Sequence, residues 1–109
     1  PSQLIDLTAM QLERLVAGTQ VSLPLLAETL GLPVRTLQHH LAQAGMSYRE
    51  MLSEARFRLA TDWLATSNKP IAEIATDLGY CDASNFTRAF RKMSGLSPRT
   101  YRQKSSVDT

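Results

Sequence analysis

Hydrophobic residues recur at three- and four-residue steps along almost the whole chain, and glycine, proline and capping residues divide this pattern into segments. Steps of this size place apolar side chains on one face of an α-helix. No segment alternates apolar and polar residues over the length of a strand. The pattern therefore predicts an all-α fold of about seven helices.

Local signals set the expected ends of these helices. Thr8 with Gln11 has the spacing of a capping box and predicts the start of the first helix, and Ser47 with Glu50 predicts the start of the longest one. Ser22 and Asp82 are the expected N-caps of the second and sixth helices. In the sixth helix Phe86, Phe90 and Met93 are spaced to face the core. The segments expected to be helical are 8–18, 22–30, 34–45, 48–66, 70–79, 82–93 and a short last one, 97–101.

One structural unit occurs twice in the chain. Residues 26–47 align with residues 74–97 if two single-residue insertions are allowed, and the paired residues are Leu26 with Ile74, Ala27 with Ala75, Leu30 with Leu78, Gly31 with Gly79, Leu37 with Phe86, Leu41 with Phe90, Gly45 with Gly95 and Ser47 with Ser97. Each copy is a short helix, a turn that contains glycine, and a second helix. The alanine permits close helix crossing, and the glycine accepts a left-handed turn. This is the pattern of a helix-turn-helix.

The segment 48–66 joins the two copies and is expected to be a single helix with apolar residues on more than one face. At about 1.5 Å per residue its length is roughly 30 Å. One turn of B-DNA is about 34 Å, so this length permits two recognition helices to enter successive major grooves. The expected division is a first helix-turn-helix subdomain at 1–47, a linker helix at 48–66 and a second helix-turn-helix subdomain at 67–109.

The positive charge of the chain is concentrated near its end. The formal net charge is only +2. Residues 1–55 carry three cations and five acids, whereas residues 83–104 carry six cations and no acid. A surface of one sign suits a polyanion such as double-stranded DNA. A solvated helix face with no ligand is the plainer interpretation of the same charges.

Several other classes of protein lack support in the sequence. No apolar run is long enough to span a membrane, and the single cysteine, Cys81, indicates a reducing compartment, so a cytoplasmic location is expected. His39, His40 and Cys81 do not have the spacing of metal ligands, and no metal or cofactor is expected. Paired carboxylates, a phosphate-binding loop and a nucleophile beside a base are all missing, so the protein is not expected to be an enzyme.

Residues 22–103 resemble the DNA-binding domain of AraC/XylS-type transcription regulators. The motifs that carry the resemblance are LAETLGLPVRTLQHHLAQAGMSYREML, EARFRLATDWLATS and PIAEIATDLGYCDASNFTRAFRKMSGLSPRTYR. The resemblance implies two helix-turn-helix units that bind double-stranded DNA, an activator or less often a repressor in a bacterium, and RNA polymerase as a candidate partner. It also implies a longer parent protein, with an effector-binding or dimerisation domain that is absent from this chain.

Carried over position by position, the resemblance assigns two sets of DNA-contacting residues. The expected base contacts are Arg35, Gln38 and His39 in the first unit and Ser84, Asn85 and Arg88 in the second; the residues expected beside them or near the DNA backbone are Thr36, His40, Ala83 and Thr87. Independently of the resemblance, the charges of Arg91, Lys92, Arg99 and Arg102 suit contacts with the phosphates of the DNA backbone. The residue types fit these roles, since arginine pairs with guanine, asparagine or glutamine pairs with adenine, and cations contact phosphates.

The first unit departs from the family pattern at two positions. His39 stands where the family commonly has arginine, and Leu41 where it has an aromatic residue. A neutral imidazole is a weaker partner for guanine than a guanidinium, so we expect the second unit to supply more of the affinity.

Two alternatives to DNA binding stay open at this point. One is a helical protein-interaction module that docks an acidic partner through its basic face. The other is a membrane-surface role, which requires bulky apolar residues to be exposed along a helix. DNA binding should weaken steeply with salt, which separates it from protein docking.

Overall fold

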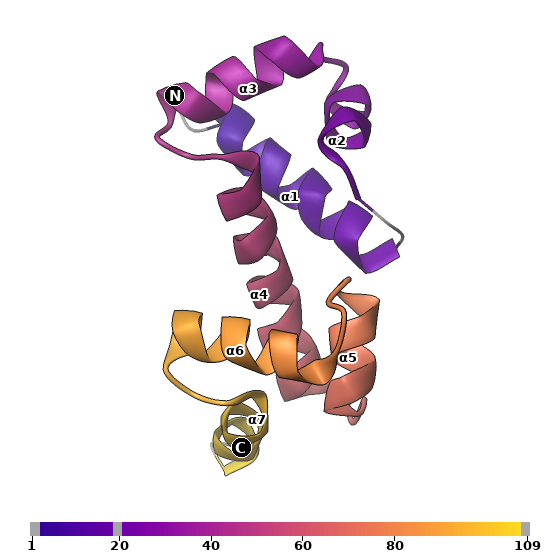
Figure 1. Cartoon of the computed structure of the whole chain (residues 1–109), viewed down its shortest axis with the longest axis vertical. Helices are drawn as coiled ribbons and strands as arrows, with labels where there is room; N and C mark the ends of the chain where they lie inside the picture. The colour runs from indigo at the N-terminus through magenta and orange to yellow at the C-terminus, as the bar shows by residue number, and fades with distance from the viewer. Residues whose placement is uncertain (1–2, 19–20, 108–109) are drawn as a thin grey trace. The chain divides into compact units, whose positions relative to one another are not determined.

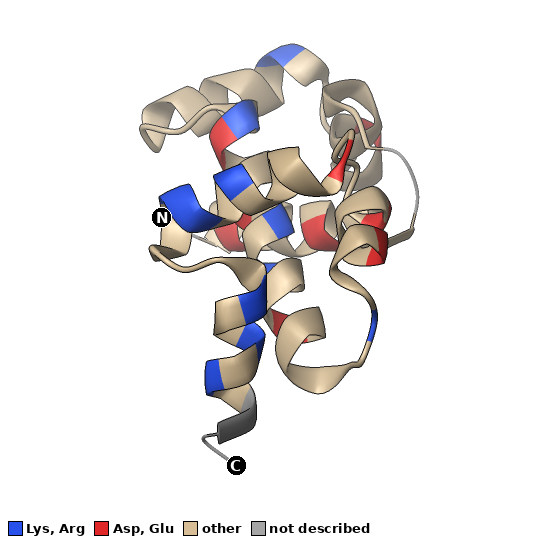
Figure 2. Cartoon of the chain, turned by 60° about the horizontal axis from the view of Figure 1, so that its bottom comes forward, with Lys and Arg blue, Asp and Glu red and all other residues tan. Residues whose placement is uncertain are grey.

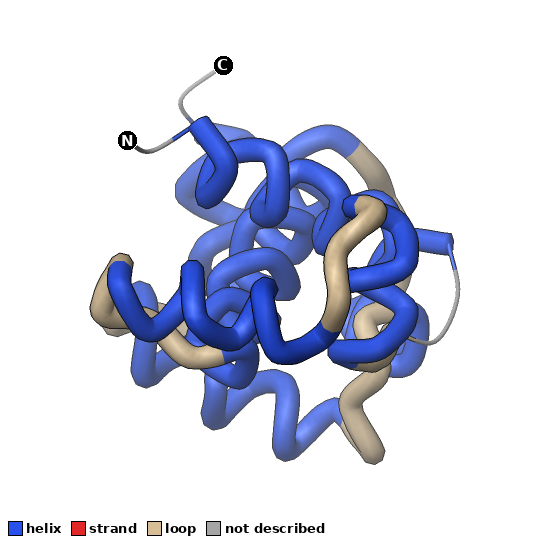
Figure 3. Tube along the Cα trace, turned by 90° about the horizontal axis from the view of Figure 1, so that it is seen from above, coloured by secondary structure: helices blue, strands red, loops and turns tan. Residues whose placement is uncertain are grey.

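The computed structural model describes residues 3–18 and 21–107, and these residues form seven helices without a strand among them (Figures 1 and 3). The helices are α1 (Gln3–Gly18), α2 (Leu23–Leu30), α3 (Val34–Gln43), α4 (Tyr48–Thr66), α5 (Ile71–Asp77), α6 (Ala83–Ser94) and α7 (Pro98–Val107). The predicted all-α fold of about seven helices is confirmed. The outermost residues of the two expected subdomains, 1–2 and 108–109, lie outside the described residues.

The chain divides into two compact units, Pro1–Arg56 and Phe57–Thr109, and α4 contributes residues to both. In the first unit α1 packs against α2, and α2 packs against α3. Its buried apolar residues come from all four helices and are Leu12, Val16, Leu26, Ala27, Leu37, Leu41, Met51 and Ala55. The core of this unit is therefore aliphatic.

The second unit has an aromatic core centred on Phe90. The Phe90 ring lies 5.1 Å from that of Phe57 in α4, 5.8 Å from that of Phe86 and 5.5 Å from that of Tyr101 in α7, measured between ring centroids. These distances are in the range of favourable aromatic pairs. The buried Phe90 side chain of α6 thus contacts both α4 and α7.

The repeat predicted from the sequence is confirmed by the backbone. Ala27 and Ala75 are both buried, and Gly31 and Gly79 both have positive φ, at 72° and 95°. In each copy the N–H of the residue after the glycine donates to the alanine carbonyl, at 2.9 and 3.0 Å. A residue with a side chain would be strained at this turn, so the glycine sets how the second helix leaves the first.

Three predicted N-terminal caps are present, and they are Ser22 before α2, the Ser47–Glu50 pair before α4 and Asp82 before α6. Asp82 accepts the backbone N–H of Asn85 through Oδ1 at 2.8 Å. The first copy differs here, because α3 begins after Pro33, which makes no side-chain cap. A side-chain cap is therefore a feature of only one recognition helix.

The predicted start of the first helix is wrong. The helix begins at Gln3, and Thr8 lies inside it. The Thr8 side chain is buried, and its hydroxyl donates to the carbonyl oxygen of Leu4 at 2.7 Å. A threonine inside a helix can satisfy its hydroxyl in this way, four residues back, so the spacing of Thr8 and Gln11 does not mark a cap.

Two predictions near the end of the chain are also corrected. The last helix does not stop at Tyr101 but continues to Val107. Met93 is 43% exposed and does not belong to the core. The inner face of α6 consists of Phe86 and Phe90, and Met93 lies beyond them near the end of the helix.

Replacing Asp82 with alanine is expected to lower the free energy of unfolding of the second unit by about 1 kcal/mol, because the N–H of Asn85 loses its acceptor. Asp82→Asn keeps an acceptor oxygen and should retain most of the stability. Urea unfolding can be followed through Trp63, the only tryptophan, which lies in the same unit. Equal free energies of unfolding for Asp82→Ala and Asp82→Asn would contradict this role of Asp82.

Candidate nucleic-acid interface

The second helix of each helix-turn-helix, α3 and α6, is held to its own unit by one side only. Leu37 and Leu41 are buried on the inner side of α3, and Phe86 and Phe90 on the inner side of α6. The remaining side of each helix is called here the outer face. Five predicted base contacts are exposed, and these are Arg35, Gln38, His39, Ser84 and Arg88. The outer faces therefore carry polar groups that take no part in the core.

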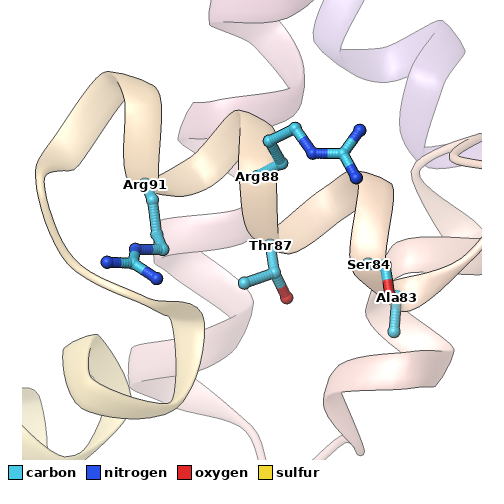
Figure 4. A pocket seen from close by; sticks show the side chains of 5 residues that line it. All are labelled: Ala83, Ser84, Thr87, Arg88 and Arg91. Carbon is cyan, nitrogen blue, oxygen red and sulfur yellow. The ribbon is translucent and has the colours of Figure 1, made fainter.

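The outer face of α6 borders an open groove of about 480 Å³. It is lined by Ala83, Ser84, Thr87, Arg88 and Arg91. Figure 4 shows Thr87 and Arg91 leaving the helix on one side, while the Arg88 guanidinium extends toward Ser84 at the start of the helix. Four of the five lining residues have hydrogen-bonding side chains, which suit contacts with base edges and phosphates.

Asn85 and Arg88 form a pair on α6. Arg88 donates from Nη1 to Oδ1 of Asn85 at 3.3 Å. Asn85 is only half-buried, and Arg88 is exposed. Residues three apart are neighbours on a helix surface, so the sequence held the signal for this contact. The pair orients the guanidinium and leaves its other donors available for a ligand.

Most of the positive charge of the second unit lies along α6 and α7 (Figure 2). Arg91, Lys92 and Arg99 are exposed. Arg102 is half-buried, and its guanidinium donates to the backbone carbonyls of Leu64 and Lys69. Nothing in the sequence signals these two hydrogen bonds of Arg102, because their acceptors are backbone atoms more than thirty residues away.

The first unit presents a less basic outer face. Arg35 is the one cation of α3 when His39 and His40 are neutral. The ring of His40 lies 6.3 Å from that of His39, and His40 also lines a pocket of about 300 Å³ together with Leu4 and Ile5 of α1. Thr36 and His40 are both half-buried. The exposed polar groups of α3 are thus Arg35, Gln38 and His39, with Gln43 at the end of the helix.

Within 3–18 and 21–107, no three residues among His, Cys, Asp and Glu are placed to hold a metal ion. No helix in this part of the chain is long and apolar enough to cross a membrane.

Comparison with known proteins identifies the family. The model of a helix-turn-helix domain family matches residues 26–104, which include both copies of the repeat. The chain belongs to the AraC-type helix-turn-helix family of transcription regulators. It is a DNA-binding domain of that family.

Relatives of this AraC-type domain are regulators much longer than the chain. The ornithine utilization regulator of Pseudomonas aeruginosa is 46% identical over 69 residues, which cover 63% of this chain and 20% of that protein. The transcriptional activator NphR of Rhodococcus is 31% identical over 100 residues, or 90% of this chain and 30% of that protein. The chain thus spans between a fifth and a third of the length of these two relatives.

Solved structures share the fold of this AraC-type domain. The DNA-binding domain of AdpA, in complex with a target DNA, is 25% identical with a TM-score of 0.74, over 96% of this chain and 94% of that one. A DNA-binding transcriptional dual regulator from Escherichia coli K-12 has a TM-score of 0.81 at 24% identity, over 91% and 88%.

If Arg91 contacts a phosphate, Arg91→Ala should weaken binding to every duplex sequence by a similar factor. The slope of log affinity against log salt should become shallower by about 0.9, the value for one phosphate contact. Arg14→Ala is the matched control, since Arg14 is exposed on α1 and outside both outer faces. Fluorescence anisotropy at several salt concentrations measures both slopes, and equal slopes would exclude Arg91 from the interface.

Proposed function

We propose that this chain binds double-stranded DNA sequence-specifically, with the outer faces of α3 and α6 in successive major grooves. The observation that carries the proposal is the division of both helices into a buried apolar side and an exposed polar side, which carries arginine and glutamine in α3 and arginine and serine in α6. An α-helix fits the major groove, where these side chains distinguish base pairs. The family membership and the DNA-bound structure of the AdpA domain support the same function.

The proposed contacts divide by chemistry. Arg35 and Arg88 suit guanine, where a guanidinium can bond O6 and N7 together, and Gln38 suits adenine. His39 and Ser84 can bond base edges, and Asn85 can do so while it orients Arg88. Phosphate contacts are proposed for the exposed cations Arg91, Lys92 and Arg99, which set position without distinguishing bases. Thr36, Ala83 and Thr87 lie beside these residues at the edge of the interface.

The proposal extends to the longer protein that contains this domain. Since the chain spans only 20% of the ornithine utilization regulator, an effector-binding or dimerisation domain is proposed in the remainder of the parent. An activating output, through contact with RNA polymerase in the bacterial cytoplasm, is proposed as well. It is supported by relatives such as NphR, which is named as a transcriptional activator.

Selection of bound sequences from a random duplex pool tests the function directly. We expect recovery of an asymmetric site with two half-sites about ten base pairs apart, one for each recognition helix. Recovery of one half-site would limit sequence recognition to a single unit. A pool that shows no enrichment, with binding to an acidic protein instead, would favour a protein-interaction module.

Arg88→Ala is expected to weaken DNA binding more than Arg35→Ala. The second unit holds more cations around its recognition helix, and the first has His39 where an arginine is common. Removing one bidentate arginine–guanine contact should cost about 1–3 kcal/mol. Titration of both variants with the selected duplex at one salt concentration compares them. A larger loss for Arg35→Ala would reverse the proposed order of the two units.

A further inference from the structure

Arg102 differs from the other cations assigned to phosphate contacts. Arg91, Lys92 and Arg99 are exposed, whereas Arg102 is half-buried. Its Nε donates to the carbonyl oxygen of Leu64 at 3.1 Å, and its Nη2 donates to the carbonyl oxygen of Lys69 at 2.8 Å. The guanidinium is therefore already bound on two of its nitrogens by the protein itself.

The two acceptors of Arg102 lie at the junction between α4 and α5. Leu64 is in the last turn of α4, where carbonyl groups lack an intrahelical donor and carry the negative end of the helix dipole. Lys69 is in the loop that follows. Hydrogen bonds from a cation to such acceptors are stronger than neutral ones. Arg102 thus joins α7 to the end of α4 and to the loop that precedes α5, the first helix of the second helix-turn-helix.

The same loop is held from a second direction by the Lys69 side chain. Its Nζ lies 4.5 Å from the centroid of the Trp63 ring in α4 and pairs with Asp77 at the end of α5. The backbone and side chain of Lys69 therefore connect α4, α5 and α7 at one point. One of the two carbonyls that Arg102 binds therefore belongs to a residue whose side chain also contacts α4 and α5.

The residue before Arg102 connects α7 to the recognition helix. The Tyr101 ring lies 5.5 Å from that of Phe90, which is buried in α6. Adjacent residues of α7 thus contact α6 on one side and the α4–α5 junction on the other. α7 can set the orientation of α6 relative to α5 through these two contacts.

We infer that Arg102 is a positioning residue for the second recognition helix and does not contact phosphate. By holding α7 to the α4–α5 junction, it fixes α6 in the orientation that its outer face needs to meet base edges. The inference rests on the proposed function, because the effect of Arg102 on the orientation of α6 is detected through DNA binding.

The test compares Arg102→Gln with Arg99→Gln in the 109-residue chain, since Arg99 is an exposed arginine of the same helix. The probe is the duplex recovered by selection. Arg102→Gln should lower the affinity about tenfold or more, as loss of two charge-assisted hydrogen bonds implies, with an unchanged salt slope. Arg99→Gln should make the slope shallower by about 0.9.

Arg102→Lys and single-base variants of the duplex distinguish the remaining roles. A phosphate contact accepts lysine, whereas the fork that spans two carbonyls does not, so Arg102→Lys should stay close to Arg102→Gln. In Arg102→Gln, discrimination should fall at base pairs facing α6 and persist at those facing α3. A smaller folded fraction would instead lower binding to all sequences by one factor.

Three results would overturn the inference. The first is an Arg102→Gln variant that binds the duplex with wild-type affinity. The second is a salt slope in Arg102→Gln as shallow as that of Arg99→Gln, together with wild-type affinity in Arg102→Lys. The third is an Arg102→Gln variant that loses affinity by the same factor for every single-base variant of the duplex. Failure of the proposed function is a separate result, namely no enriched sequence with the wild-type chain. In that case urea unfolding still tests the two carbonyl contacts, because Arg102→Gln should unfold at lower urea than Arg99→Gln.

Discussion

The interface depends on holding a recognition helix from one side only. In α6 this is done by Phe86 and Phe90, whose rings are buried while the opposite side of the helix stays exposed. The positive φ of Gly79 and the buried Ala75 let α5 and α6 approach closely enough for those rings to fill the core. Because residues three and four apart share a face, two anchoring rings leave the intervening positions for a ligand. The first unit uses Leu37 and Leu41 in the same way.

The two helix-turn-helix units share the buried alanine and the turn glycine but differ in the residues packed around the second helix. α6 has an aromatic core, a side-chain cap at Asp82 and α7 packed against it. α3 has leucine anchors and no side-chain cap. The cations are also unevenly shared, since six lie between residues 83 and 104. The two units thus share the buried alanine and the turn glycine, whereas the residues around them differ.

The fold was largely predictable because its signals are local. Capping residues, turn glycines and the repeat all act within a few residues, and they led to the correct number of helices and to three correct caps. The start at Thr8 was wrong because a helical threonine bonds its own backbone equally well. Met93 was misplaced because spacing alone does not say where a core ends. The acceptors of Arg102 could not be predicted, since a carbonyl brought close by tertiary folding leaves no trace in residue type.

The separation of buried anchors from exposed polar groups has an evolutionary consequence. Ser84 and Arg88 are exposed, so a change at either position removes nothing from the aromatic core. The residues proposed to contact bases can therefore vary while the core of the unit stays intact. Changes at Phe90 affect stability first, because its ring contacts three others. Under the proposed function, single substitutions on the outer face would change the preferred target in a domain that still folds, whereas substitutions of the anchors would first cost stability.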